Sequence, residues 1–369
     1  RAHITGGLLR SVLAFVPVCY HIAVCVNCAS AFIVGSSGVR ATLQGGQGAF
    51  FLGMRFFPSG SRLLSWSGGE LAIVWDADSG SKLHTLRHRR EVVVGRPLPC
   101  GRAVTCTGDG TCVVWDADSG SALYSFKSPF VHDVEPLMPG DRILTWAFRG
   151  PTAVWDVATG TQVCRLPGAR SAIYSAEALP DGRRFVTVSR TTRAIIWNAR
   201  TCKAELSLHH SDIITTVSVV AWGAQIVTLD ADGRVDVWSA LTGRRLRTLP
   251  IPAAMWAHRL YLQPFADDRV LVTDAFGLHI FNTTTAQIMF SVENEEEGGR
   301  GAIRAFDVSK AGDLLAACST SSFTVWDARR GVRLQTFETK LEECLVSIGL
   351  ANPSDTDAFR TGLAWDELL

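Results

Sequence analysis

The chain has 369 residues, of which 47% are hydrophobic and 19% charged, and it contains 33 glycines and 11 tryptophans. This composition is typical of a folded, turn-rich protein with a sizeable core, and it excludes intrinsic disorder over most of the chain. The 36 basic and 35 acidic residues leave a net charge of +1, so no global field favours nucleic acid or an anionic membrane.

The first patterned segment, residues 11–35, is almost uncharged and long enough to cross a bilayer. Hydropathy alone would make it a transmembrane or signal segment, and its small residues at 28–31 resemble a signal-peptide cleavage site. Its spacing favours a different interpretation, because Pro17 precedes Val34 by the same interval as Pro58 precedes Trp75. We therefore expect these residues to belong to the first unit of a repeat, with the membrane interpretation as the alternative.

The next segment, residues 48–87, has the pattern of four short strands joined by turns. The run GAFFLGMRFF ends at a Pro-Ser-Gly turn, SRLLSWS ends at Gly-Gly, and ELAIVWD and SKLHTLR flank an ADSG turn. Asp76 and Gly80 suit that tight turn, because Asp can bond its own backbone and Gly can adopt a positive φ. The segment therefore predicts a four-stranded antiparallel meander.

The Trp-Asp sequence that ends the third strand of this meander returns about every 40 residues. The aromatic residues of the successive copies are Trp75, Trp115, Trp155, Trp197, Trp238, Phe281 and Trp326. A meander of this size cannot bury both of its faces alone. The copies are therefore expected to stack side by side and close into a ring.

The period, the Trp-Asp ending and the turn residues resemble those of WD-repeat β-propellers over some 330 residues. The resemblance implies an all-β fold, a single propeller of four-stranded antiparallel blades that spans residues 1–340. Eight blades are expected, with seven as the alternative, because the N-terminal unit depends on spacing alone. The expected blade units lie near residues 8–44, 48–87, 91–127, 132–167, 171–208, 212–249, 257–291 and 301–338. A short C-terminal extension, residues 341–369, is expected to pack on the ring or on a partner.

The family's structural tetrad connects the Trp to a Ser or Thr on the second strand, a His before the first strand and an Asp in the turn after the second strand. A hydroxyl residue lies ten positions before the Trp in five consecutive units, at Ser65, Thr105, Thr145, Thr187 and Thr228. Two units match the full tetrad, with His88, Thr105, Asp109 and Trp115 in one and His210, Thr228, Asp232 and Trp238 in the other. The resemblance implies that these groups form buried hydrogen bonds. The chain departs from the family where Arg87 rather than Gly precedes His88, and where Phe281 replaces Trp.

No motif predicts an enzyme, a cofactor or a metal site. The Ser, Thr, His and Asp residues recur at periodic positions, where hydrogen bonding explains them better than a nucleophile with its base. Cys25 and Cys28 lack the second ligand pair that a zinc site needs. Adjacent His209 and His210 would point to opposite faces of a strand, and residues 230–233 match only part of a calcium loop.

Most of the ten cysteines lie inside apolar stretches, as Cys106, Cys112 and Cys318 do. A thiol in such a stretch packs like a small hydrophobic side chain. We therefore expect reduced, buried thiols and an intracellular protein, with the cytoplasm as the favoured compartment.

In propellers of this family, the loops before each first strand and those between the second and third strands meet on one face, which commonly binds partners. The sequence places five arginines on this loop face, and we name them the basic arc: Arg89, Arg90, Arg149, Arg190 and Arg193. Phe148 and Trp256 are expected beside them as aromatic anchors. The alternative is that all of these are solvated loop side chains.

These observations predict a non-catalytic scaffold, a propeller subunit that binds protein partners in a larger assembly through its loop face or blade edges. One alternative is a propeller module of a longer regulatory or sensor protein, because the chain starts with Arg1 instead of Met. Another is an RNA-associated scaffold that uses the basic arc, in which case binding would depend steeply on salt. A membrane is expected as a partner only if residues 11–35 are a transmembrane or signal segment.

Overall fold

The computed structural model describes the chain in segments that are almost entirely β-structure. They are residues 21–27, 30–35, 38–44, 51–137, 141–147, 150–167, 173–252, 260–265, 267–273, 277–293, 303–308, 313–319, 322–338 and 349–351. Two short 3-10 helices, Pro99–Gly101 and Ala221–Gly223, are the helical elements within these segments.

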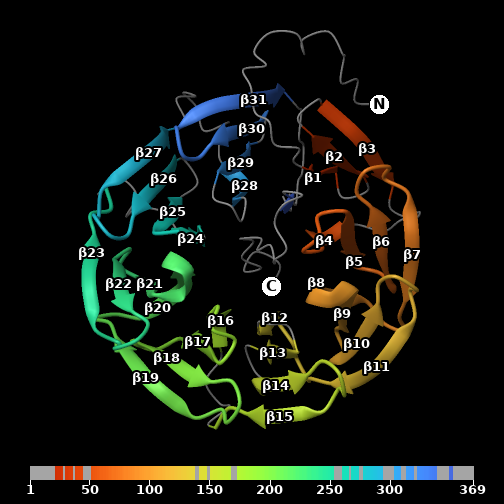
Figure 1. The fold of residues 1–369 in the computed structure, drawn as a ribbon, viewed down its shortest axis with the longest axis horizontal. Helices are drawn as coiled ribbons and strands as arrows, with labels where there is room; N and C mark the ends of the chain where they lie inside the picture. Colours follow the sequence, from red (N-terminus) through yellow and green to blue (C-terminus); the bar gives the residue numbers. More distant parts are fainter. Residues whose placement is uncertain are drawn as a thin grey trace.

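The described strands form eight four-stranded antiparallel sheets arranged around a ring (Figure 1). Seven sheets consist of four consecutive strands, and the first strand of each lies nearest the centre of the ring (Figure 1). Four of these blades contain β4 (Phe51–Phe56), β5 (Arg62–Ser67), β6 (Leu71–Asp76) and β7 (Lys82–Arg87); β8 (Val92–Pro97), β9 (Arg102–Thr107), β10 (Thr111–Asp116) and β11 (Ala122–Lys127); β12 (Asp133–Leu137), β13 (Arg142–Trp146), β14 (Ala153–Asp156) and β15 (Gln162–Arg165); and β16 (Ile173–Ala178), β17 (Arg184–Ser189), β18 (Arg193–Asn198) and β19 (Ala204–His209). The other three contain β20 (Ile214–Val220), β21 (Gln225–Asp230), β22 (Val235–Ser239) and β23 (Arg245–Leu249); β24 (Tyr261–Pro264), β25 (Arg269–Thr273), β26 (Gly277–Asn282) and β27 (Ile288–Glu293); and β28 (Ile303–Val308), β29 (Leu314–Ser319), β30 (Ser322–Asp327) and β31 (Val332–Glu338). The predicted all-β propeller with four-stranded antiparallel blades is confirmed.

The eighth sheet joins distant parts of the described chain. It contains β1 (His21–Asn27), β2 (Ser30–Gly35), β3 (Gly38–Gln44) and, paired antiparallel with β1, β32 (Gly349–Ala351). We expected the N-terminal unit at 8–44 to supply its own innermost strand, but β32 holds that position beside β1. The continuous blades among the described residues therefore number seven, which is the smaller of the two predicted numbers, and the remaining sheet is a composite.

The segment at 11–35, for which a membrane span was the alternative, contributes strands to this composite sheet. Residues 21–27 and 30–35 of that segment are β1 and β2, whereas residues 11–20 lie outside the described part of the chain. No described helix is long and apolar enough to cross a membrane.

The tight turn after the third strand has the structure that Asp76 and Gly80 predict. Asp76 Oδ1 accepts hydrogen bonds from the backbone N–H and the hydroxyl of Ser79, both at 2.7 Å. Gly80 has a φ of +68°, and a Cβ there would lie 2.4 Å from the Cβ of Ala41 in the neighbouring sheet. In later blades the Asp or Asn at the same position again accepts from the backbone N–H three residues further on. Local turn chemistry therefore sets the hairpin between the third and fourth strands.

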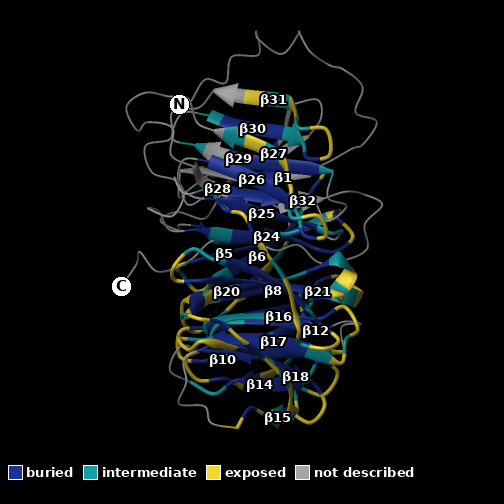
Figure 2. Ribbon diagram, turned by 90° about the vertical axis from the view of Figure 1, so that its left-hand side faces the viewer, coloured by how far each residue is buried: buried dark blue, intermediate teal, exposed yellow. Residues whose placement is uncertain are grey.

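The hydrophobic core lies between adjacent sheets. Phe126 on β11 stacks on Trp155 of the next blade, with ring centroids 4.3 Å apart. Trp66 packs against Gly53 of its own blade and Gly95 of the next, where a Cβ would lie 2.1 Å and 2.5 Å from its ring. Figure 2 shows buried residues along the strands and exposed residues mainly in the turns and outer strands. Burial of both faces of each sheet therefore stabilises the ring.

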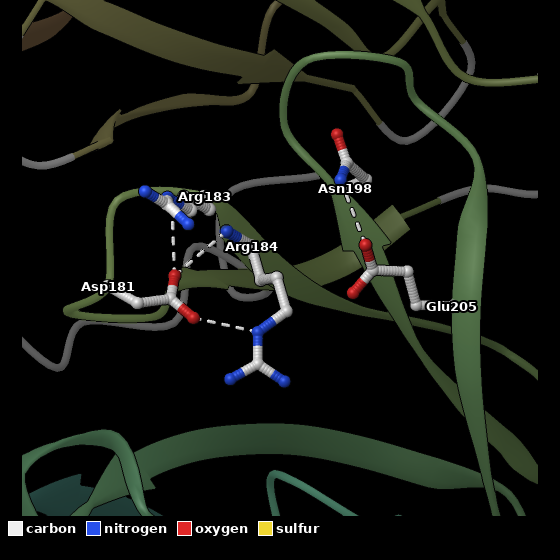
Figure 3. Close-up of a pocket in the computed structure, with 5 residues that line it drawn as sticks. All are labelled: Asp181, Arg183, Arg184, Asn198 and Glu205. Carbon is white, nitrogen blue, oxygen red and sulfur yellow. Dashed lines mark hydrogen bonds and ion pairs between the residues drawn. The ribbon is translucent and has the colours of Figure 1, made fainter.

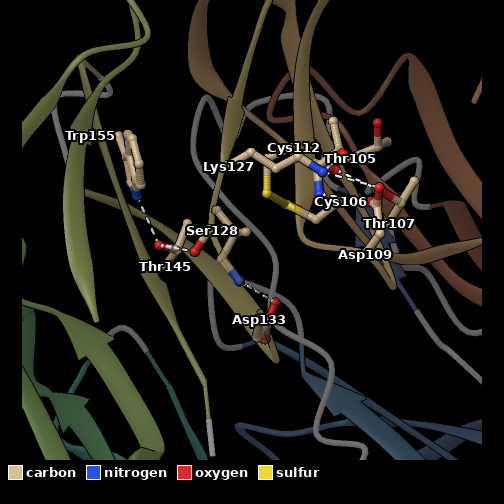
Figure 4. Close-up of a disulfide and its surroundings, with 12 residues drawn as sticks. Thr105, Cys106, Thr107, Asp109, Cys112, Lys127, Ser128, Asp133, Thr145 and Trp155 are labelled. Atoms are coloured by element: carbon tan, nitrogen blue, oxygen red, sulfur yellow. Dashed lines mark hydrogen bonds and ion pairs between the residues drawn. A yellow bond between two sulfur atoms is a disulfide. The ribbon is translucent and has the colours of Figure 1, made fainter. Parts of the chain in front are cut away.

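Two disulfides contradict the expectation of reduced thiols, and one of them joins Cys106 and Cys112. Cys106 on β9 and Cys112 on β10 are opposite each other in the register of the sheet and form a buried disulfide (Figure 4). A second disulfide connects Cys164 on β15 to Cys202 in the turn after β18, so it joins adjacent blades. Because disulfides are typical of oxidising compartments, the cysteines no longer support an intracellular location.

Candidate functional site

The predicted contact between Trp and a hydroxyl group is present in all five consecutive units. The indole Nε1–H donates to the hydroxyl oxygen at 2.7 to 2.8 Å in the pairs Trp75–Ser65, Trp115–Thr105, Trp155–Thr145, Trp197–Thr187 and Trp238–Thr228. The Trp lies on the third strand of its blade and the hydroxyl residue on the second. Each bond therefore satisfies a buried donor and fixes two neighbouring strands.

The tetrad predicted around Trp238 is complete, but its acid is Asp230 rather than Asp232. Thr228 Oγ1 lies 2.5 Å from His210 Nε2, and His210 Nδ1 lies 3.2 Å from Asp230 Oδ2. Because an indole can only donate, Thr228 accepts from Trp238, and the acceptors near its own hydroxyl proton are His210 Nε2 and, at 3.4 Å, the backbone carbonyl of Asp236. Asp230 and Thr228 are two positions apart on β21 and share one face of the sheet, whereas Asp232 is exposed in the following turn.

The tetrad predicted around Trp115 lacks its acid. Thr105 Oγ1 lies 2.8 Å from His88 Nε2, but Asp109 accepts from Thr107 Oγ1 at 2.6 Å and from a backbone N–H at 3.0 Å. The hydrogen bonds from Thr107 and Thr111 hold the pKa of Asp109 below its usual range. Burial lowers the pKa of His88, which favours the neutral ring that Thr105 can donate to. The hydroxyl groups of both sets are buried, so these residues connect strands inside the blades.

The described members of the basic arc are exposed and lie at one face of the ring. Arg89 and Arg90 lie between β7 and β8, whereas Arg190 and Arg193 lie where β17 connects to β18. In an antiparallel meander, these two kinds of connection lie at the same end of the strands. Arg190 lies over the ring of Tyr174, 5.3 Å from its centroid. No ion pair connects these four arginines to any other residue that the structure describes.

The remaining residues predicted on this face cannot be placed beside them. Phe148, Arg149 and Trp256 lie outside the described residues.

The innermost strands carry a set of buried polar residues, which we name the inner belt. This set was not predicted from the sequence. Its members have equivalent register positions in the seven continuous blades and are 0 to 7% exposed: Arg55, Arg96, Glu135, Glu177, Ser218, Gln263 and Asp307. The signal was a polar residue in the second half or middle of each first strand, at the same register position in every continuous blade.

The inner belt forms a buried network of charges and hydrogen bonds. Arg96 donates from Nη2 to Asp133 Oδ2 at 2.7 Å and from Nε to a backbone carbonyl of the next blade at 2.6 Å. Gln263 Nε2 donates to Asp307 Oδ1 at 3.1 Å. Burial raises the pKa of Asp307 well above its usual range, and burial together with the charge of Arg96 lowers the pKa of Arg55 to about 9. Such a network stabilises one arrangement of the blades.

On the face opposite the basic arc, the first residue of the second strand bonds to the next blade. We name these bonds the seam contacts. Three are donated from Nη1 to a carbonyl, from Arg102 to Val157 at 3.1 Å, Arg184 to Ala240 at 2.8 Å and Arg269 to Ala328 at 2.9 Å. Two involve side chains, from Arg62 Nη1 to Asp118 Oδ1 at 2.7 Å and from Thr283 Oγ1 to Gln225 Oε1 at 2.6 Å. The sequence signal was an Arg thirteen positions before the Trp in four consecutive units.

A solvent-open groove lies on this opposite face. One hollow of about 510 Å³ is lined by Asp181, Arg183, Arg184, Asn198 and Glu205, which Figure 3 shows. A second hollow of about 630 Å³ shares three of these residues and is lined by Asp141, Arg142, Asp181, Gly182, Arg183, Asn198 and Arg200. The second hollow lies where the β12–β15 and β16–β19 blades meet, because both blades line it, whereas the lining of the first comes from the β16–β19 blade.

Asp181 is the most constrained group in the groove. Its Oδ2 accepts from Arg184 Nε at 2.7 Å, and its Oδ1 accepts from the backbone N–H groups of Arg183 and Arg184 at 2.9 and 3.0 Å. Partial burial raises the pKa of Asp181, but the hydrogen bonds from Arg184 and the backbone outweigh it, so the pKa lies below its usual range. Among the described residues, those of the groove included, no group of three or more His, Cys, Asp or Glu side chains could hold a metal ion.

Comparison with known proteins identifies the fold. No protein-family model and no curated protein matches the sequence. The structure is similar to a computationally designed protein, Ika8, with a TM-score of 0.67 and 18% identity over 88% of this chain and 95% of that one. It is also similar to the C-terminal WD40 domain of Sif2, with a TM-score of 0.68 and 14% identity over 82% of this chain and 90% of that domain. Together with the repeated Trp-to-hydroxyl contacts, these similarities show that the chain has the fold of a WD-repeat β-propeller.

Proposed function

We propose that the protein is a non-catalytic scaffold, a subunit of a larger assembly that binds a protein partner through the loop face. The observation that carries the proposal is the exposure of Arg89, Arg90, Arg190 and Arg193 on one face without a described ion-pair partner. Arginine is enriched where proteins bind one another, because its planar guanidinium makes several hydrogen bonds at once. An acidic partner surface is the complement that this face favours.

The polar side chains of the tetrads have a structural role, so the proposed binding role rests on other residues. The Thr, His and Asp side chains of the tetrads bond to one another or to turns inside the blades. The domain of Sif2 to which this chain is similar is described as a WD40 domain, a fold that commonly presents surfaces for other proteins. The binding role therefore depends on the surface residues of this chain and not on the fold alone.

Affinity purification from the native source, followed by mass spectrometry, tests this proposal. We expect a stoichiometric protein partner with the wild type and its loss with the triple variant Arg89→Ala/Arg90→Ala/Arg193→Ala. The matched control is Arg244→Ala/Arg330→Ala/Arg333→Ala, which removes the same charge from exposed positions at or beside the turns between third and fourth strands, on the opposite face. Equal partner loss with both triple variants would contradict the assignment of the loop face.

Nuclease treatment distinguishes the scaffold from its RNA-associated alternative. A partner that survives nuclease and moderate salt is bound by protein contacts. Binding that disappears with nuclease and falls steeply between low and high salt would instead favour RNA, because neutralising phosphates releases counterions.

We further propose that the composite sheet is an eighth blade that closes the ring. Its support is the pairing of β32 with β1, in which Ile22 is opposite Leu350. The sheet also lies between the first and last continuous blades in Figure 1. Closure by strands from distant parts of the chain ties the first and last sheets together.

A further inference from the structure

The seam between the β12–β15 and β16–β19 blades differs from the other seams. Arg142 begins β13 and holds the position from which Arg102 and Arg184 bond to the next blade. Among the arginines that begin a described second strand, Arg142 alone makes no such bond. The disulfide between Cys164 and Cys202 crosses this seam instead. A covalent bond therefore connects the blades at this seam, and the Arg142 side chain makes no hydrogen bond to the next blade among the described residues.

Three guanidinium groups in the second hollow have no hydrogen-bond partner among the described residues. Arg142 is half-buried, and its Nε is a buried donor without an acceptor. Arg183 and Arg200 are exposed, and their side chains make no ion pair or hydrogen bond with the described residues. A buried donor without an acceptor is costly, so a bound acceptor would relieve it.

The charge balance of the hollow specifies the kind of acceptor. Asp181 is neutralised by its ion pair with Arg184, 2.7 Å long. Asp141 is then the one carboxylate of the lining that has no side-chain partner among the described residues. Asp156, which is outside the lining, also interacts electrostatically with Arg142. The three arginines still outnumber the carboxylates left to balance them, so the hollow has an excess of positive charge. A phosphate monoester carries nearly two negative charges at neutral pH and offers several oxygens to guanidinium groups.

We propose that the groove between the β12–β15 and β16–β19 blades is a binding site for a phosphate monoester, held by Arg142, Arg183 and Arg200. The hollow of about 630 Å³ has room for the ester and the group that carries it. The site lies on the face opposite the basic arc, so it does not depend on the function proposed above. Two sources share this chemistry, a phosphorylated small molecule and a phosphorylated side chain of another protein.

Calorimetric titration of the full chain with phenyl phosphate and a phosphoserine peptide library of degenerate flanking sequence tests the proposal. Phenol and the unphosphorylated library serve as the paired controls. We expect binding of a phosphorylated probe, weakened about tenfold or more by Arg183→Ala/Arg200→Ala, because each lost charge-assisted hydrogen bond carries a large share of the affinity. Arg142→Gln is expected to weaken binding as well, provided that its thermal unfolding matches that of the wild type.

The control variant is Arg244→Ala/Arg330→Ala, which removes two exposed arginines from equivalent turns of other blades on the same face. It is expected to bind like the wild type. Tighter binding of the peptide library than of phenyl phosphate would identify a phosphoprotein as the source, and the reverse would identify a small molecule. Absence of binding to both phosphorylated probes, or equal weakening by the control and groove variants, would overturn the proposal. Neither result would affect the test of the loop face, which uses different variants and a different readout.

Discussion

Trp115 shows how one side chain connects two strands of a blade. Its indole donates to Thr105 at 2.7 Å, and Thr105 in turn contacts His88 at 2.8 Å. Trp115 is 7% exposed and Thr105 0%, so water cannot replace the bond between them. The stability of the blade therefore depends on a hydroxyl group that the interval of ten residues already predicted.

Replacing Thr105 by Val tests this dependence. Val has the shape of Thr but no hydroxyl, so Thr105→Val leaves the indole N–H and the His88 ring without their partner. We expect the free energy of unfolding to fall by about 1 to 3 kcal/mol in urea denaturation. Thr105→Ser retains the hydroxyl and should lose less. Equal losses in the two variants would mean that packing of the methyl group, and not the hydrogen bonds, stabilises the site.

Asp307 makes stability depend on pH. Burial raises its pKa in the folded state above the ordinary value of 3.8. Above about pH 4, the unfolded chain loses this proton while the folded chain keeps it. The contribution of Asp307 to the free energy of unfolding is therefore largest below that pH and falls as the pH rises. The fall is at most about 1.4 kcal/mol per pH unit.

The variant Asp307→Asn should remove this dependence. An amide retains an oxygen for the 3.1 Å hydrogen bond from Gln263 but cannot ionise. Urea denaturation between pH 4 and 7 should therefore give a smaller fall in unfolding free energy for the variant than for the wild type. Parallel curves for the two proteins would contradict a protonated Asp307.

At the level of elements, the sequence predicted the meanders better than the connections between them. Apolar alternation and turn residues are local, so they located the strands, the hairpins and the Trp-to-hydroxyl pairs. The pairing of β32 with β1 depends on contacts between the two ends of the chain, which no local pattern encodes. The disulfide between Cys106 and Cys112 was missed for a similar reason, because a cysteine in an apolar strand looks the same whether it is oxidised or reduced.

Truncation tests the contribution of β32. Removing residues 349–369 would leave the inner edge of β1 unpaired, whereas removing residues 352–369 would retain β32. By differential scanning calorimetry we expect a lower Tm for the longer truncation than for the shorter one. The longer truncation should also self-associate, because an unpaired strand edge can pair with another chain. The same Tm for both truncations would show that β32 adds nothing to the ring.

The disulfide between Cys164 and Cys202 should contribute more stability than the one between Cys106 and Cys112. The first closes a loop of 38 residues and the second a loop of 6, and chain entropy then gives about 4 and about 2 kcal/mol. Urea denaturation of Cys164→Ser/Cys202→Ser and of Cys106→Ser/Cys112→Ser measures the two losses. The opposite order would mean that packing around the buried Cys106 and Cys112 outweighs the loop entropy.

At the level of the whole molecule, the ring has two faces of different chemistry. The face of the basic arc presents Arg89, Arg90, Arg190 and Arg193. The spacing of the repeats and the order of the loops were enough to assign these residues to it. The opposite face contains the seam contacts and the groove beside Arg142. The groove was not predicted, because it depends on a seam where a disulfide replaces an arginine contact. The sequence pattern of one blade does not show which contact connects it to the next blade.

Hydrogen–deuterium exchange of the protein with and without its copurified partner is the most direct test of a scaffold that uses the loop face. We predict that the partner slows exchange in residues 88–91 and 189–193, with little change on the opposite face. Protection confined to residues 181–184 and 198–205, or to the outermost strands, would contradict the assignment of the loop face.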